Sequence, residues 1–174
     1  MVNLKIDSSH STVNFVVKHM KFAKVRGSFG TFAGEINFDE ANVANSSVNA
    51  TIEAASVSTG DANRDGHLQS PDFFGIESNP NFTFVSTSVE GSGDEFVVNG
   101  DLTMNGVTKP VALETEYNGM GESPMGSTVY SFSAETKVNR KDFNINWNAP
   151  IEAGGFLVSD EVKIEIEIEA NPAS

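Results

Sequence analysis

The last regular segment of the chain, residues 162–169, alternates apolar and charged residues without a break. An alternation with period two places one set of side chains on each face of a β-strand. As a helix, the same segment would spread its isoleucines around the axis. A slip of one residue in register would bury three glutamates, so the register is tightly specified. The segment is therefore predicted to be a strand with one buried face, formed by Val162, Ile164, Ile166 and Ile168.

The same alternation recurs along most of the chain. Asn105-Gly106 separates two such runs and predicts a tight hairpin, because both residues accept a positive φ. Asn118-Gly119 is predicted to end the strand that returns from this hairpin. Together the runs predict about eight antiparallel strands in a single domain, residues 1–174. The other clear runs lie at residues 12–19, 36–38, 48–52, 82–84, 96–104, 111–117 and 130–134.

Three glycines interrupt a phenylalanine-rich strand pattern at Gly27, Gly30 and Gly34. Glycines at this density predict bulges or tight bends, which a sheet needs in order to close on itself. They favour an all-β closed barrel, and a two-sheet sandwich is the alternative. The 13 phenylalanines predict a dry interior. An eight-stranded barrel can either fill this interior with side chains or leave space for one ligand.

The alternation stops between residues 58 and 84. Asp61 or Thr59 is placed to cap a short helix over residues 62–68, which Pro71 would end. We expect this helical segment, near residues 61–75, to lie across one end of the barrel. A long connection of this kind in an all-strand protein is often functional.

Charge and composition exclude several classes of function. The formal net charge is −13 and the pI is near 4.5, so the chain would be repelled by nucleic-acid phosphates. No apolar run reaches the roughly 20 residues of a membrane-spanning helix. The chain has no cysteine, and its three histidines lack metal-ligand spacing, so no metal site is predicted. No signal peptide is visible, which leaves the chain either cytoplasmic or a mature exported domain.

Several ordered blocks of the chain resemble the YceI-like family, and the likeness runs from about Leu4 to Ala170. The most distinctive block lies in the connection, where Thr59, Arg64-Asp65-Gly66-His67-Leu68 and Asp72-Phe73-Phe74 precede Phe82-Thr83-Phe84. The other blocks are His10-Ser11, Val17-Lys18-His19, Val25-Arg26-Gly27-Ser28-Phe29, Phe32-Ala33-Gly34, Ile36-Asn37-Phe38-Asp39, Gly100 to Val111, Arg140-Lys141-Asp142-Phe143 and Asp160-Glu161-Val162.

The resemblance implies a lipocalin-like antiparallel barrel that encloses a polyisoprenoid lipid. The family is associated with polyisoprenoids, namely prenyl pyrophosphates and prenylated quinones such as ubiquinone, and sometimes with other long-chain amphiphiles; no catalytic cofactor is implied. The implied role is non-enzymatic binding, transport or storage, and many members are periplasmic while some are cytoplasmic. Two alternatives remain: an enzyme that acts on a prenyl lipid in the same cavity with His67 as acid or base, and a solid-core interaction module. A homodimer through exposed sheet edges is also possible from the pattern.

If the barrel is open, its lipid tail is expected to contact inward-facing apolar residues. Arg64 and His67 are the candidate contacts for a lipid headgroup, although Arg64 could instead pair with Asp65 or with a strand carboxylate. Four cations in nine residues, Lys18, Lys21, Lys24 and Arg26, could attract an anionic headgroup or form an ordinary solvated face. The predicted tail contacts are Phe15, Val17, His19, Phe29, Phe74, Phe82, Phe84, Leu102, Met104, Leu113, Phe132, Trp147 and Ile164.

Overall fold

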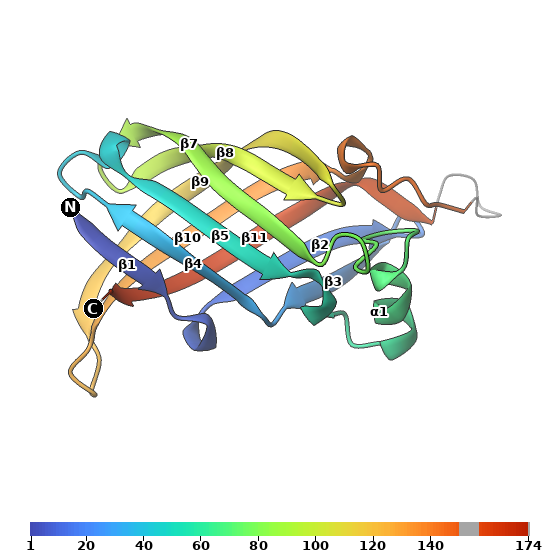
Figure 1. Ribbon diagram of the computed structural model, residues 1–174, viewed down its shortest axis with the longest axis horizontal. Helices are drawn as coiled ribbons and strands as arrows, with labels where there is room; N and C mark the ends of the chain where they lie inside the picture. The colour runs from blue at the N-terminus through green and yellow to red at the C-terminus, as the bar shows by residue number, and fades with distance from the viewer. Residues whose placement is uncertain (150–156, 174) are drawn as a thin grey trace.

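The computed structural model describes residues 1–149 and 157–173 of the chain. One antiparallel sheet curls into a closed barrel, with a single α-helix at one end and both chain termini near the other (Figure 1). Its strands are β1 (Val2–Ile6), β2 (Thr12–His19), β3 (Ala23–Phe29), β4 (Phe32–Phe38), β5 (Ser47–Glu53), β6 (Val57–Ser58), β7 (Asn81–Ser92), β8 (Glu95–Met104), β9 (Val107–Glu122), β10 (Thr128–Asn139) and β11 (Val158–Pro172). Its helices are η1 (Ser8–His10), η2 (Val43–Asn45), η3 (Ala54–Ser56), α1 (Ala62–Gln69) and η4 (Arg140–Phe143).

The barrel closes where the two ends of the chain meet. The strand order β1-β4-β5-β7-β8-β9-β10-β11 forms a ring of eight, because β1 also pairs with β11 through Leu4 and Pro172. The part of β11 from Val158 to Glu167 pairs with β2 instead of β1. Strands β1 and β2 therefore lie end to end beside β11 and together occupy one strand position of the barrel. Strands β3 and β4 do the same on the next position, and β6 extends the edge beside β3. The predicted eight-stranded barrel is confirmed, and the sandwich is not formed.

The structure confirms the predicted hairpin at Asn105-Gly106 and corrects the predicted end of the strand that follows it. Asn105 and Gly106 have φ of 54° and 75° and join β8 to β9. The prediction that the returning strand ends at Asn118-Gly119 is wrong, because β9 runs on to Glu122. The register against β10 shifts between Ser131 and Phe132, and Gly119 accepts this bulge with a φ of 124°.

The three glycines near the start of the chain serve different purposes. Only Gly30 stands at a bend, at the corner between β3 and β4. Gly27 lies within β3 beneath the ring of Phe15, and a Cβ at Gly34 would come within 2.5 Å of the Asn49 carbonyl oxygen. The prediction of bends at all three positions is therefore wrong for two of them, where a close approach rather than a turn requires glycine.

The helix follows its sequence signals. The Asp61 side chain accepts hydrogen bonds from the backbone N–H groups of Asn63 and Arg64, which caps α1. Pro71 follows one residue after the C-cap Ser70. After the helix, the chain turns so that Phe73 and Phe74 are buried against the barrel. The helix thus lies across one end of the barrel, which we call the helical end (Figure 1).

Candidate functional site

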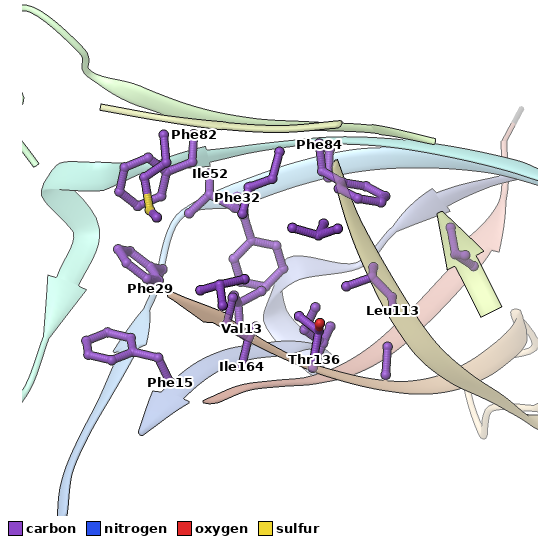
Figure 2. A pocket seen from close by; sticks show the side chains of 18 of the residues that line it. Val13, Phe15, Phe29, Phe32, Ile52, Phe82, Phe84, Leu113, Thr136 and Ile164 are labelled. Carbon is purple, nitrogen blue, oxygen red and sulfur yellow. The ribbon is translucent and has the colours of Figure 1, made fainter. Parts of the chain in front are cut away.

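The interior of the barrel holds an apolar cavity of about 280 Å³. Figure 2 shows side chains from opposite walls reaching into the same space, with Phe82 and Ile52 facing Val13 and Ile164. Almost all of the surface that faces this space is carbon. The interior is therefore not a fully packed core, and the filled-barrel alternative does not describe this chain.

The period-two alternation of each strand supplies the cavity wall. On β7, Phe82 and Phe84 point inward, and Thr83 lies between them on the other face. Phe84 is directly opposite Leu102 of β8, which also faces the cavity. In the same way, Phe15 of β2 lies opposite Ile164 of β11, and both side chains face the cavity. Sheet register alone thus brings residues far apart in sequence onto one apolar wall.

Most of the predicted tail contacts lie on this wall. They are Phe15, Val17, Phe29, Phe74, Phe82, Phe84, Leu102, Met104, Leu113, Phe132 and Ile164. Two of the predicted residues, His19 and Trp147, do not line the cavity. His19 ends β2 beyond the cavity, where it pairs with Ala23 and Val158. Trp147 is half-buried and packs against the rings of His67 and Phe73.

Sequence reasoning missed a second group of wall residues. Phe32, Ile52, Val98 and Phe73 all line the cavity. Phe32, Ile52 and Val98 lie on strands, where choosing the inward face requires knowing the register, whereas Phe73 lies in the turn after α1. Other wall residues that are absent from the predicted tail contacts are Ile6, Val13, Ile36, Phe38, Val48, Ala50, Leu68, Val89, Phe96, Val111, Ala134, Val138, Ile145, Val158, Val162, Ile166 and Ile168.

An aromatic cluster closes one end of the cavity, and we call this the closed end. Phe38 is 2% exposed, and its ring centroid lies 4.7 Å from that of Tyr117 and 5.1 Å from that of Phe132. Tyr130 packs on the outer side of the same cluster. Burial raises the pKa of the Tyr117 hydroxyl above its usual value. These contacts leave a blind, apolar end beside the chain termini.

The helical end carries the polar groups of the distinctive sequence block. His67 Nε2 lies 2.9 Å from Asp72 Oδ2, and its ring meets Phe73 and Trp147 edge-on at centroid distances of 5.0 and 4.8 Å. Phe73 lines the cavity, so His67 is separated from the apolar space by one ring. His67 therefore lies at the helical end of the barrel but not in the cavity wall.

Arg64 and Asp65 are not paired with each other. The Arg64 guanidinium donates from Nε to the Thr59 hydroxyl and from Nη2 to the Thr59 carbonyl, each at 2.7 Å. Asp65 accepts from the Thr59 backbone N–H at 2.9 Å and from its hydroxyl at 2.6 Å. Both charged side chains thus fasten the start of the connection to α1, and they share the partner Thr59 instead of forming the Arg64–Asp65 pair that was one alternative.

One buried arginine at the helical end was not predicted as part of the site. Arg140 is 3% exposed and also borders the cavity. Burial lowers the pKa of its guanidinium, and Asp160, 3.6 Å away, acts in the opposite direction. The guanidinium donates at 2.7–3.3 Å to the backbone carbonyls of Ile145, Trp147, Val158 and Ser159.

These bonds join the segment after η4 to the start of β11. Because four carbonyls already engage it, Arg140 serves as a fastener of the helical end rather than as a free donor for a ligand. Arg140 begins the charged run Arg140-Lys141-Asp142, and no local sequence pattern marks it as buried.

The cavity wall offers few side chains that could take part in a reaction or bind a polar group. Its polar wall residues besides Arg140 are neutral, among them Thr115 and Thr136. Among residues 1–149 and 157–173, no cluster of histidine and carboxylate side chains is arranged to hold a metal ion. In the same residues, no helix is long and apolar enough to cross a membrane. The arrangement suits burial of a hydrocarbon chain.

Known proteins share both the sequence and the barrel. Residues 4–170 match the model of the YceI-like domain. Protein YceI of Escherichia coli O157:H7 is 48% identical over 143 residues, which cover 81% of this chain and 75% of that protein. The crystal structure of Burkholderia cenocepacia BcnA superposes with a TM-score of 0.83 at 27% identity, covering 94% of this chain and 98% of BcnA. A polyisoprenoid binding domain from Saccharophagus degradans has the same fold, with a TM-score of 0.67 at 13% identity over 99% of this chain and 100% of that domain.

Proposed function

The chain belongs to the YceI-like domain family, and we propose that it binds a polyisoprenoid lipid in the barrel and carries or stores it without changing it chemically. The observation that supports this most is the apolar cavity enclosed between the aromatic cluster and α1. The polyisoprenoid binding domain that shares the fold provides a precedent for this ligand class.

Burial of hydrocarbon is the proposed source of affinity. Each Å² of apolar surface removed from water contributes about 25 cal/mol, with no need for directional contacts. At about 30 Å³ for each group the size of a water or a methylene, a cavity of about 280 Å³ holds roughly nine such groups. This corresponds to about two isoprene units, so a longer tail would need the walls to adjust or would extend past the helical end.

The headgroup is proposed to lie at the helical end, because the closed end is sealed by packed rings. His67 stands beside Phe73 and Trp147 at this end, with its side chain 39% exposed. The guanidinium of Arg140 is already bound to four carbonyls, so the cavity itself presents little positive charge to a pyrophosphate. We therefore favour a neutral quinone such as ubiquinone over a prenyl pyrophosphate as the ligand held inside.

A periplasmic or otherwise exported location is part of the same proposal, and the cytoplasm is the alternative. The enzyme alternative would require His67 to reach a bound substrate. In the structure Phe73 separates His67 from the cavity, which favours binding over catalysis.

Uptake of a short-tailed ubiquinone, measured by native mass spectrometry, tests the proposal. Ala134→Phe would place a ring inside the cavity, whereas Ala112→Phe adds the same ring to an exposed position of β9. We expect the inward variant to bind about tenfold more weakly and the outward variant to match the unaltered protein. Urea unfolding of both variants confirms that each is folded.

Equal uptake by both variants would contradict binding in the cavity. A bound species whose mass changes during incubation would contradict the non-enzymatic role. Replacing the quinone with a prenyl pyrophosphate of equal tail length shows which headgroup the protein prefers.

A further inference from the structure

The turn between β2 and β3 exposes apolar side chains at the helical end of the barrel. We call Met20, Lys21 and Phe22 the β2–β3 tip. Phe22 is 87% exposed and Met20 is 48% exposed. A phenylalanine side chain this exposed to water contributes no burial energy to the stability of the fold, and it would do so only if another surface covered it. The tip is therefore an apolar surface without a partner in the described chain.

The backbone of the tip is held in an unfavourable conformation. Met20 has a φ of 53° and Lys21 a φ of 69°, although neither is glycine, asparagine or aspartate. Residues held in this region cluster at functional sites. The flanking pair, His19 with Ala23, and the bond from Met20 N–H to the Leu157 carbonyl at 2.9 Å keep the turn in place. The strand ends thus present the tip away from the barrel wall.

Positive charge surrounds the tip in a chain that is otherwise strongly acidic. Lys18, Lys21, Lys24 and Arg26 are all exposed, and they are four of the 11 Lys and Arg residues of a chain with a net charge of −13. No Asp or Glu occurs between Asp7 and Glu35. Lys18 and Lys24 lie directly opposite each other on the hairpin. Among the residues that the structure describes, these four cations form no ion pair.

The tip also lies next to the cavity. Val17 lines the cavity two residues before His19, and His19 pairs with Val158, which also lines it. Asp160, on the same end of β11, is within 3.6 Å of Arg140 and 3.4 Å of Lys141, so its charge is partly compensated. Apolar tip, cations and cavity therefore share the helical end, while the chain termini lie at the opposite end (Figure 1).

We propose that the β2–β3 tip docks the barrel onto an anionic phospholipid bilayer. Phe22 and Met20 enter the boundary between headgroups and acyl chains, and the four cations contact lipid phosphates. Clusters of four or more basic residues beside an apolar anchor are typical of such surfaces. Acidic groups more than about 8 Å from the tip oppose docking only weakly, because exposed charges at that separation are largely screened at physiological salt.

Vesicle flotation tests this surface without any prenyl lipid present. The vesicles contain phosphatidylcholine with phosphatidylglycerol, or phosphatidylcholine alone. We expect the protein to float with the anionic vesicles and to be released by added salt. Phe22→Ser and Lys21→Glu should each lower the bound fraction about fivefold or more. The matched control is Met125→Ser, which removes an apolar side chain that is 92% exposed in the turn between β9 and β10, at the other end of the barrel.

Two results would overturn the proposal. One is that the unaltered protein does not bind anionic vesicles, or that Met125→Ser lowers the bound fraction as much as Phe22→Ser does. The other is a dimer, seen by sedimentation velocity, that Phe22→Ser abolishes, because a second copy would then be the partner of the tip. Since the vesicles carry no prenyl lipid, neither result bears on the proposed cavity ligand. Conversely, failed quinone uptake would not contradict the docking surface.

Discussion

The ring of Phe15 lies directly over Gly27 on the neighbouring strand. The two residues are register partners between β2 and β3, and a Cβ at position 27 would come within 2.6 Å of the Phe15 Cε1 atom. Phe15 can therefore lie flat against the sheet and contact Phe29, 5.5 Å away between ring centroids, because residue 27 has no side chain. The glycine shapes the cavity wall at the helical end.

Gly27→Ala is expected to force Phe15 out of this position. The overlap should cost about 1–3 kcal/mol in the free energy of unfolding, measured with urea. Gly30→Ala is the matched control, because no atom lies within 4 Å of a Cβ at that position. An unfolding midpoint for Gly27→Ala equal to that of the control would show that Phe15 does not depend on the glycine.

Arg140→Met should destabilise the helical end. The substitution keeps an aliphatic stem but leaves the carbonyls of Ile145, Trp147, Val158 and Ser159 without their shared donor. We expect a loss of about 3 kcal/mol in the free energy of unfolding.

The neighbouring Lys141 is half exposed and provides the control for Arg140. Lys141→Met should change stability by no more than about 0.5 kcal/mol. Similar losses in the two variants would contradict the role assigned to the buried guanidinium.

Asp7 and His10 predict a small pH dependence at the corner between β1 and β2. The hydroxyl of Ser9 and the imidazole of His10 hold the pKa of Asp7 at about 2, below its usual 3.8. The Asp7 carboxylate in turn raises the pKa of His10 above 6.5. The contribution of Asp7 to the free energy of unfolding is present above its unfolded pKa and is lost as pH falls through about 2. The contribution of His10 to the same free energy is present below 6.5 and is lost as pH rises through its raised pKa.

An NMR titration of the imidazole protons checks the Asp7–His10 pair. His10 should titrate above 6.5 in the unaltered protein and return toward 6.5 in Asp7→Asn. Asp39→Asn removes another carboxylate of lowered pKa and should leave His10 unchanged. An identical His10 midpoint in Asp7→Asn would rule out the ion pair.

The release route of a bound lipid should depend on the helical end. Trp147 is partly exposed there and packs on Phe73, while Tyr130 is partly exposed at the closed end. Trp147→Ala should speed ubiquinone release about threefold or more, because less surface covers the exit. Tyr130→Ala should leave the release rate near that of the unaltered protein. Faster release from Tyr130→Ala than from Trp147→Ala would place the exit at the closed end instead.

Much of the barrel could be predicted from the sequence because strand alternation carries the inside-outside information. The pattern Val162 to Ile168 identified the inward face of β11 without further knowledge. Asn105-Gly106 placed a hairpin for the same local reason. Where a bulge intervenes the argument fails, as at Gly119, because a bulge depends on the register of the partner strand.

The polar part of the site was less predictable. Thr59 joins Arg64 and Asp65 through contacts that depend on the fold of the connection, so sequence adjacency suggested the wrong pair. Arg140 binds carbonyls of a segment that follows it in the chain, and no local pattern specifies such partners. His19 continued the inward alternation of β2, but the barrel interior ends before it.

The central claim is that the cavity holds a polyisoprenoid tail. Native mass spectrometry of the protein as purified, followed by organic extraction and identification of the lipid, tests it most directly. The account predicts a bound species of several hundred daltons that fragments into isoprene units. A protein mass without ligand, together with no uptake of added ubiquinone, would contradict it.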